Sequence, residues 1–521
     1  MLDTLIKNAL VIDGTGETPY RAKIGISEGK LVMAPYSTDA RVEVDAEGCI
    51  LCPGFIDVHS HSDALLGKAF LAKAKLSQGI TTEIVGNCGY SLFPISRDPK
   101  RFQEICELVG ILTRDVPKEM KEFVDSDKFF QYVQSKQLYL NVAFMVGHGT
   151  LRASVMGLES RRATGPELCR MKELLCSAME AGAIGLSSGL AYAPGGYADR
   201  RELRELVECI SRYNGVYATH LRNESDSYIE SLTEALETVA DTGVHLQLSH
   251  QKVCGATNCG KSKHAIEIID KARRSGQVVA IDIYPYTFAM STLHATLPIQ
   301  LLALGENACC RMLRNPHVRE RLRREMPTID GRLRQCGGFS GIQIACAPET
   351  PQADGMRISE YAKLRNIDQF EAFFDILQEN GWRATAFYHF IQREDMLRFL
   401  HYPYAMVGTD GILRSEMELC HPRGFETFPK MLAMALERGI PLQAMVRRMT
   451  ALPAKQFFLE NKGQICTGFD ADITILDENI LKDSRQKVTD CIRQVFVSGT
   501  RVWKDGALTG KTPGTCLKRK K

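Results

Sequence analysis

The 521-residue sequence contains no apolar run that approaches the roughly 18 residues needed to span a membrane. Residues 1–4 also lack the charged and apolar regions that begin a secretory signal peptide. The net charge is only +3, which gives no indication of a nucleic-acid partner. We therefore expect neither a membrane nor a nucleic acid among the partners of this protein.

Internal repeats and low-complexity linkers are absent too, but cysteine is plentiful, with 17 residues. Without a secretory signal, so many cysteines indicate a reducing compartment, and we predict a cytoplasmic protein with free thiols. Cys254 and Cys259 could form a zinc pair, but no second pair lies nearby, which favours two free thiols in a loop. The chain length suits a large catalytic domain plus a smaller one.

A recurring unit organises the middle of the chain: a strand-sized apolar run that ends abruptly in polar or glycine residues. Eight such runs occupy 50–58, 82–85, 142–146, 183–186, 216–219, 245–248, 278–283 and 405–408. Helix-length stretches separate most of them, such as 167–181, where Leu168, Met171 and Leu175 recur at helical spacing. Apolar strands that alternate with helices indicate a parallel sheet, and eight units predict an α/β fold, the TIM (β/α)8 barrel.

The two chain ends look different from the middle. Residues 4–50 and 463–510 both consist of short β-type runs separated by turns, and we expect the two to pair. We predict a small β-sandwich domain built from 1–50 plus 463–521, and a barrel domain at 51–462. The stretch 293–349 is long for a barrel loop and predicts an insertion in the barrel. A ninth strand-like run, 384–390, is left without an assigned place.

His59 and His61 follow the first predicted barrel strand. Strand side chains alternate between faces, so both imidazoles point the same way and can bind one metal ion. This pair alone is a weak signal, because core or surface histidines occur by chance. The chain has only 12 histidines, however, and the ends of other strands carry four more ligand-type residues: Cys88, His220, His250 and Asp410. Six such residues at one mouth of the barrel predict a metal site.

The ligand types favour zinc, because imidazole, thiolate and carboxylate form a borderline-soft set. Six residues exceed the needs of one tetrahedral zinc ion. We predict one tightly bound Zn²⁺ on Cys88, His220 and His250, and a second, weaker site on His59, His61 and Asp410. The number of metals in the active form stays open. Asp410 is also the predicted catalytic residue, placed to accept a proton from activated water and pass it to a leaving nitrogen.

The segment PGFIDVHSHSD at 53–63 resembles the first motif of the amidohydrolase superfamily. Other segments are similar to the N-acyl-D-amino-acid deacylase (D-aminoacylase) branch, in which a cysteine bridges the metals. They are 78–82, 86–89, 147–152, 185–195, 219–224, 249–252, 282–287, 408–411, 421–423, 497–499 and 505–510. The resemblance covers essentially the whole chain. It implies zinc-dependent hydrolysis of small-molecule N-acyl-D-amino acids to a carboxylate and a free D-amino acid.

The same resemblance implies a set of substrate-binding residues. Lys252 and Tyr284 would bind the substrate α-carboxylate, the lysine by charge and the tyrosine by a hydrogen bond. Tyr192 would line the pocket near the scissile amide or the side chain, and Arg222 and Arg423 are further candidates. The alternative is structural in each case: a surface lysine, core tyrosines, and buried arginines that orient neighbouring groups.

Some positions depart from the family pattern. Gln251 stands where many relatives have a second histidine, and Ser188 replaces a frequent threonine. The stretch 288–295 is expected to shape the side-chain pocket, and it carries no arginine that could pair with an acidic substrate side chain. This favours a neutral or apolar D-residue.

Two other functions compete with this interpretation. A cyclic-amide hydrolase of the hydantoinase or dihydroorotase kind usually bridges its metals with a carboxylated lysine at the end of the fourth strand. Here that strand ends in Ser187 and Ser188, and Cys88 offers the alternative bridge. A non-catalytic scaffold of the same fold would be expected to have lost ligands, whereas all six are present. The acyl group, the oligomeric state and the physiological pathway stay open.

Overall fold

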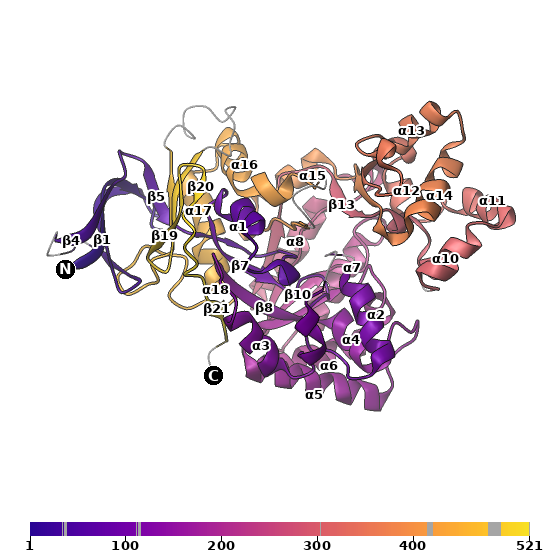
Figure 1. Ribbon diagram of the computed structural model, residues 1–521, viewed down its shortest axis with the longest axis horizontal. Coiled ribbons are helices and arrows are strands. Elements are labelled where there is room, and N and C mark those ends of the chain that lie inside the picture. The colour runs from indigo at the N-terminus through magenta and orange to yellow at the C-terminus, as the bar shows by residue number, and fades with distance from the viewer. Residues whose placement is uncertain are drawn as a thin grey trace.

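The computed structural model describes residues 1–33, 35, 39–110, 112, 116–302, 304–413, 420–477 and 491–519. Figure 1 shows three parts along the longest axis of the molecule. A β-rich part lies at one end, a barrel wrapped by helices lies in the middle, and a mostly helical part projects at the other end. The N-terminus lies at the β-rich end, where indigo and yellow strands lie together, whereas the last described strand of the chain lies beside the barrel.

Eight parallel strands form the central barrel. In spatial order they are β6 (Phe55–Asp57), β7 (Ile80–Val85), β8 (Asn141–Gly147), β9 (Gly185–Gly189), β10 (Val216–His220), β11 (His245–Leu248), β12 (Val279–Ile283) and β16 (Ala405–Val407). The backbone N–H of Asp410 donates to the carbonyl of His59 at 2.8 Å, which joins the segments after β16 and β6. The predicted (β/α)8 barrel is confirmed, and its near-continuous burial explains why its strands are so apolar.

The helices of the barrel follow the strands as the sequence periodicity predicts. They are α1 (Ala69–Leu76), α2 (Pro99–Gly110), α3 (Ser126–Gln134), α4 (His148–Met156), α5 (Gly165–Ala181), α6 (Arg200–Ser211), α7 (Tyr228–Val239), α8 (Lys261–Arg274), α15 (Arg393–His401), α16 (Arg423–Glu437), α17 (Leu442–Met449) and α18 (Ala451–Gln456). Helix α5 begins with a capping box of Thr164 and Glu167 and buries Leu168, Met171 and Leu175. It ends at Gly182, whose φ of 129° favours glycine.

Both chain ends contribute to one antiparallel-rich sheet, the predicted small β-sandwich. Its strands run in the order β20 (Ala507–Leu508), β19 (Thr500–Lys504), β18 (Ile492–Val497), β17 (Ile473–Leu476), β5 (Ile50–Pro53), β1 (Leu2–Val11), β2 (Tyr20–Ser27) and β3 (Lys30–Met33), and β4 (Ala40–Asp45) pairs with β1. The β5–β17 pair joins the two ends, and residues from both ends share one apolar core. The last strand, β21 (Cys516–Leu517), pairs instead with barrel strand β8, although 463–521 was assigned to the sandwich.

The segment between β12 and β16 builds a separate small unit. Its antiparallel sheet has the order β13 (Ala289–Thr292), β15 (Thr385–Tyr388) and β14 (Ile342–Cys346). The helices around it are α9 (Ile299–Leu302), α10 (Glu306–Met312), α11 (Pro316–Glu325), α12 (Arg332–Gln335), α13 (Ile358–Arg365) and α14 (Gln369–Asn380). The ninth strand-like run is therefore the middle strand of this sheet. Because β15 lies between the other two strands, the unit continues well past the predicted 293–349 stretch.

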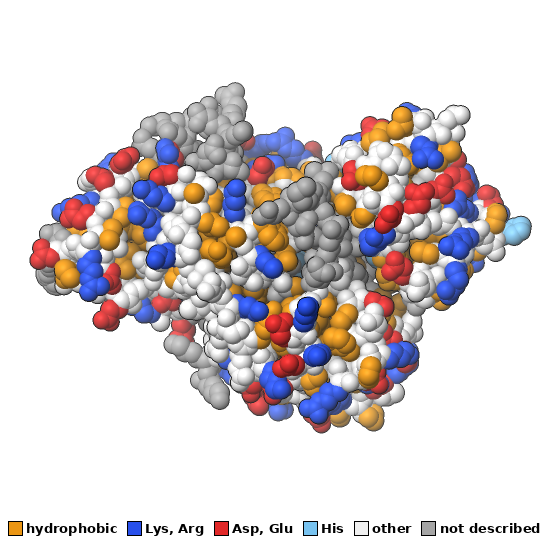
Figure 2. Space-filling model, in the orientation of Figure 1, with side chains coloured by type: hydrophobic (Ala, Val, Ile, Leu, Met, Phe, Trp, Pro, Cys, Tyr) orange, Lys and Arg blue, Asp and Glu red, His pale blue; other side chains and the backbone are white. Residues whose placement is uncertain are grey.

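Short 3₁₀ helices occur in the loops: Asp63–Leu65, Lys118–Glu122, Gly195–Tyr197, Ala256–Asn258, Leu293–Thr296, Phe339–Gly341, Pro351–Ala353 and Gly381–Arg383. No helix in the described part of the chain is both long enough and apolar enough to cross a lipid bilayer. On the face shown in Figure 2, acidic and basic side chains are mixed, with no broad area of a single charge. This mixing agrees with the near-neutral net charge.

Candidate metal centre

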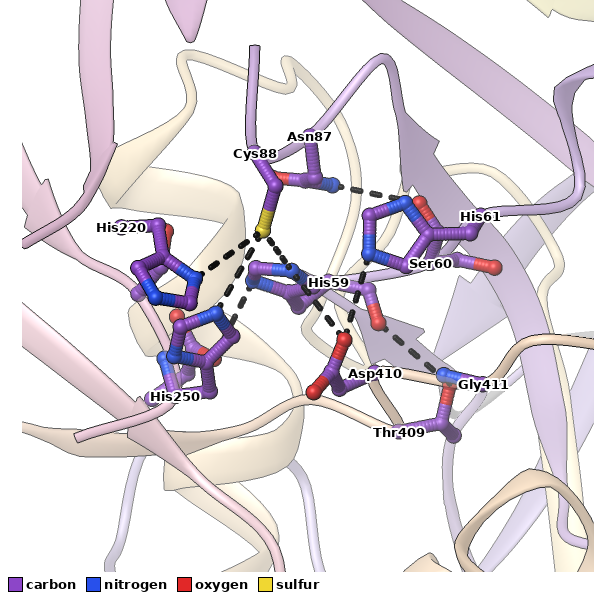
Figure 3. A network of polar contacts seen from close by, with 12 residues as sticks. His59, Ser60, His61, Asn87, Cys88, His220, His250, Thr409, Asp410 and Gly411 are labelled. Carbon is purple, nitrogen blue, oxygen red and sulfur yellow. Dashed lines mark hydrogen bonds and ion pairs between the residues drawn. The ribbon is translucent and has the colours of Figure 1, made fainter. Parts of the chain in front are cut away.

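The six predicted ligands meet at the carboxyl ends of the barrel strands, and all six are buried. β6 leads into His59 and His61, and β7 leads into Cys88. His220 is the last residue of β10, His250 follows β11, and Asp410 follows β16. Parallel strands that close into a barrel bring all their carboxyl ends to one mouth, so residues 351 positions apart become neighbours. Figure 3 shows their side chains pointing toward one another.

The Cys88 thiol occupies the middle of this group (Figure 3). Its Sγ lies 3.3 Å from His59 Nε2, 3.4 Å from His250 Nε2 and 3.8 Å from His220 Nδ1. Burial raises the pKa of the thiol, but the neighbouring His59 and His250 outweigh it, and the pKa lies well below its usual value. Cys88 is therefore poised as a thiolate, the form in which sulfur binds metals.

Asp410 faces the histidines of the first strand. Its Oδ1 lies 3.2 Å from His61 Nε2 and 3.6 Å from His59 Nε2, so His59 stands between the thiol and the carboxylate. Three of the six residues have backbones in the left-handed region: Cys88 (φ 53°), His250 (φ 32°) and Asp410 (φ 46°). Such conformations are costly for non-glycine residues and concentrate at functional sites. The left-handed backbones therefore support a functional site at these strand ends.

The donor atoms fit a divalent metal. Three groups each have ligand atoms within 4.8 Å of one another: His59, Cys88 and His250; His59, His61 and Asp410; and His220, Glu224 and His250. The buried Nδ1 of His61 makes no hydrogen bond, whereas Nδ1 of His59 lies 3.5 Å from Asp282 Oδ2 and leaves Nε2 facing Cys88 and Asp410. Mixed nitrogen, sulfur and carboxylate donors at this density suit zinc and similar ions. These groups share residues, because Cys88 lies as near to His59 as to His250. The sequence-based prediction places Cys88 in the tight metal site and His59 in the weaker one.

Glu224 is a site residue that the sequence interpretation missed. Its Oε2 lies 3.4 Å from His220 Nε2, and its Oε1 lies 3.3 Å from His250 Nδ1 and accepts from Lys252 Nζ at 2.6 Å. Burial would raise the pKa of Glu224, but His220 and Lys252 hold it well below its usual value. A carboxylate that contacts two candidate ligands fixes their orientation. The sequence did contain a signal for Glu224, because it lies four residues after His220 and inside the family-like segment 219–224.

Comparison with known proteins identifies the family. A family model described as "Amidohydrolase family" matches residues 431–503. The D-aminoacylase of Alcaligenes xylosoxydans xylosoxydans is 31% identical, over 99% of this chain and 98% of that one. The N-acyl-D-glutamate deacylase of the same organism is also 31% identical, over 99% and 97%. This chain belongs to the D-aminoacylase family of amidohydrolases.

Solved structures of this family share the whole architecture. The N-acyl-D-glutamate deacylase from Bordetella bronchiseptica, complexed with zinc and a phosphonate inhibitor, superposes with a TM-score of 0.82 at 29% identity, over 99% of both chains. A D-aminoacylase with a binuclear metal centre has a TM-score of 0.80 at 28% identity, over 100% of both. D-hydantoinase, with a TM-score of 0.54 at 17% identity over 99% of both, shares the fold alone.

Four of the five substrate-binding candidates, all except Tyr284, line a cavity of about 690 Å³ that also borders the metal centre. Lys252 lines this cavity and also lies 2.8 Å from His250 Nδ1. The Tyr284 hydroxyl is buried nearby without a hydrogen-bond partner, and burial raises its pKa to about 12, so it stays a donor. The Tyr192 ring packs edge-on against His220, with the ring centres 4.7 Å apart.

The two arginine candidates differ. Arg222 lines the cavity, but all three of its guanidinium nitrogens are engaged, by Glu234 and by the carbonyls of Gly196 and Ala198. These partners support the structural alternative for Arg222, and its substrate contact stays a prediction. Arg423 is buried, its Nη1 lies 2.6 Å from Asp410 Oδ2, and its guanidinium lies 4.9 Å above the Tyr284 ring.

A buried ionic network holds the first and last barrel strands together beneath the metal centre. Lys75 Nζ donates to Asp57 Oδ2 at 2.6 Å and to Ser60 Oγ at 2.8 Å. Asp57 in turn accepts from the Thr409 backbone N–H at 2.9 Å and from the Thr409 hydroxyl at 2.7 Å. These bonds fix the segment that carries His59 and His61 against the segment that carries Asp410, and so orient the candidate ligands toward one another.

Proposed function

We propose that this protein hydrolyses the amide bond of N-acyl-D-amino acids and releases a carboxylate and a free D-amino acid, with zinc as its metal. The observation that carries the proposal is the single buried cluster in which a thiolate, four histidines and an aspartate meet at the barrel mouth. The names of the relatives that match over the full chain support the choice of linear N-acyl-D-amino acids.

In this proposal Cys88, His220 and His250 hold the tightly bound zinc. His59, His61 and Asp410 would hold a second, weaker metal, and Cys88 lies 3.3 Å from His59, close enough to be a candidate ligand on that side as well. When bound, zinc supplies Lewis acidity, which polarises a carbonyl and makes water a nucleophile near neutral pH. Glu224 supports the tight position by contacting the two histidines.

Asp410 is the proposed proton carrier. Burial raises the pKa of its carboxyl, but Arg423 and His250 hold it well below its usual value, so the carboxylate is available as a base. It would take a proton from the attacking water and deliver it to the leaving nitrogen. Because Asp410 follows the last barrel strand and hydrogen-bonds back to His59, its position is set by the closure of the barrel.

Lys252 and Tyr284 are the proposed anchors of the substrate α-carboxylate. The Lys252 ammonium offers charge, and the partnerless Tyr284 hydroxyl offers a directed hydrogen bond. Fixing the α-carboxylate and the scissile carbonyl together would leave only one direction for the side chain, which is how a site distinguishes D- from L-substrates.

A substrate panel tests this function. The zinc-loaded protein is offered matched N-acetyl-D- and N-acetyl-L-amino acids, with hydantoin and dihydrouracil as cyclic amides. Release of the free amino acid is measured for the linear compounds, and formation of the ring-opened N-carbamoyl acid is measured for the cyclic ones. Hydrolysis of the D-compounds alone is expected. Hydrolysis confined to L-compounds would overturn the assignment, and turnover of the cyclic amides alone would favour the hydantoinase-like alternative. Protein that binds no metal would favour a scaffold. The cytoplasmic location expected from the cysteine content stays a prediction.

A further inference from the structure

The described wall of the active-site cavity contains four cationic side chains, and one of them has no anion. Three are paired with carboxylates: Arg222 with Glu234, Lys252 with Glu224, and Arg423 with Asp410. For Arg332, no carboxylate oxygen among the described residues lies within 4.0 Å, and its guanidinium donates no hydrogen bond to them. A partly buried cation that has no anion is stabilised when a ligand supplies the counter-charge.

Arg332 is the first residue of α12 in the inserted unit. Its guanidinium lies 4.7 Å above the ring centre of Tyr388, in a cation–π contact. Tyr192 and Glu224 are among its electrostatic neighbours, which places the charge next to the candidate metal centre. A guanidinium in a cation–π contact can still offer its planar N–H groups to a carboxylate, which binds them with two hydrogen bonds.

The inserted unit is fastened to the barrel on both sides of Arg332. Asp330 accepts from Asn223 at 2.8 Å and from Ser225 at 2.6 Å, and Arg334 lies 2.7 Å from Asp226. These three partners belong to the loop after β10. The same loop carries Glu224, which binds Lys252. The position of Arg332 is thereby set relative to Lys252.

We propose that Arg332 binds a second carboxylate of the substrate, so that the preferred substrates are N-acyl-D-amino acids carrying two carboxylates. The proposal rests on the proposed deacylase function, in which Lys252 and Tyr284 take the α-carboxylate. The second carboxylate has two sources, an acidic D-side chain such as glutamate or aspartate, or a dicarboxylic acyl group such as succinyl. Both present the same planar anion to the guanidinium.

If the second carboxylate lies on the D-side chain, this assignment reverses the preference for a neutral side chain inferred from the stretch 288–295; if it lies on the acyl group, that preference is kept. Several residues of that stretch do line the cavity, and they contain no arginine. The cation comes instead from Arg332, which the folding of the inserted unit brings back over the site. His294 lines the same wall, but burial, with Arg332 adding to it, lowers its pKa to about 3, so it adds no charge at neutral pH.

Matched substrates test the proposal. N-acetyl-D-glutamate and N-acetyl-D-glutamine have nearly the same shape and differ in one charge, and N-acetyl-D-alanine and N-succinyl-D-alanine test the acyl end. For the zinc-loaded protein we expect kcat/KM to favour the dianionic member of at least one pair by about 100-fold, as for a buried charged hydrogen-bonded pair. The pair that shows this preference identifies the source of the second carboxylate.

Two variants separate the charge of Arg332 from the folding of the inserted unit. Arg332→Met should lower kcat/KM for the preferred dianion by about 100-fold and leave its neutral counterpart within about threefold. Arg332→Lys should recover part of the loss. Arg324→Met removes the same charge from an exposed position of α11 in the same inserted unit, outside the cavity wall, and should leave the substrate preference unchanged. Calorimetric binding of N-acetyl-D-glutamate and N-succinyl-D-alanine should weaken in Arg332→Met in the same way.

Equal kcat/KM within both substrate pairs for the wild type would overturn the proposal, as would an unchanged preference in Arg332→Met. In those cases neutral N-acyl-D-amino acids are still hydrolysed, and the deacylase function stands. Failure of the wild type to hydrolyse any D-compound would overturn the deacylase function itself, together with the proposal that rests on it.

Discussion

Arg423 holds the carboxylate of Asp410 through the oxygen that the histidines do not contact. Its Nη1 lies 2.6 Å from Asp410 Oδ2, while Oδ1 lies 3.2 Å from His61 Nε2. The pair joins the start of α16 to the segment after β16, and both residues are buried. The carboxylate is thereby held ionised and in one orientation at the barrel mouth, as a proton carrier requires.

Replacing Asp410 by asparagine should abolish turnover while leaving zinc partly bound. The amide keeps the shape of the carboxylate but cannot accept a proton, so we expect kcat to fall by about 1,000-fold or more. Steady-state kinetics and metal analysis of the same preparation check this. Activity close to that of the wild type would show that another group carries the proton.

Replacing Cys88 by alanine should remove the tightly bound zinc. The sulfur lies within 3.3–3.8 Å of three histidines, and its loss deletes the thiolate from the proposed tight position. Elemental analysis after dialysis should find the content of tight zinc near zero, with activity lost in parallel. The exposed Cys169 provides the control, because Cys169→Ala should keep both zinc and activity. Full zinc retention in Cys88→Ala would remove the cysteine from the ligand set.

Lys252→Met should weaken substrate binding by removing the proposed partner of the α-carboxylate. We expect kcat/KM to fall by about 100-fold, mainly through KM, because the ionic contact is made before the chemical step. Lys263→Met, at an exposed position of α8, is the matched control and should behave like the wild type. A loss in Lys252→Met confined to kcat would assign the lysine to the orientation of His250, which it contacts at 2.8 Å.

The pH dependence of the free energy of unfolding should reveal the ionisation of Glu202, a buried residue that is not among the six candidate metal ligands. Glu202 accepts from Arg152 at 2.5 Å and lies 2.7 Å from His148 Nε2. Burial would raise the pKa of Glu202, but His148 and Arg152 lower it to about 2, against 4.5 for a free glutamate. Because the pKa of Glu202 is lower in the folded than in the unfolded state, its ionised carboxylate stabilises the fold. This stabilisation is complete above pH 4.5 and is lost as the pH falls toward 2.

Comparing the wild type with Glu202→Gln isolates this contribution. At pH 7 the variant should be less stable by about 3 kcal/mol, because Arg152 loses its buried anion. Between pH 4.5 and 2 the difference in the free energy of unfolding between the two proteins should shrink. Denaturant unfolding followed by circular dichroism at several pH values measures it. A difference that stays constant across that range would contradict the assigned pKa.

Much of the fold could be predicted because its signals are local. Parallel barrel strands are buried on both faces, so each of the eight appears as an apolar run, and the ligands follow directly at the ends of five of them. The helix expected at 167–181 is α5, Gly165–Ala181, with a capping box at its start. The inserted unit was harder to delimit, because its sheet pairs β13 with β15, about a hundred residues further along the chain.

The sequence by itself determined the barrel, the pairing of its two ends, and the ligand types that stand at the strand ends. Those features depend on residue periodicity and on motifs that stay together along the chain. Only the tertiary structure decided which charged side chains form ion pairs at the site. Glu224 contacts Lys252 and two histidines, Arg423 contacts Asp410, and Arg332 is left facing the cavity. Ion pairs depend on distances of a few ångströms between segments far apart in the chain, and these distances are set by how the elements pack.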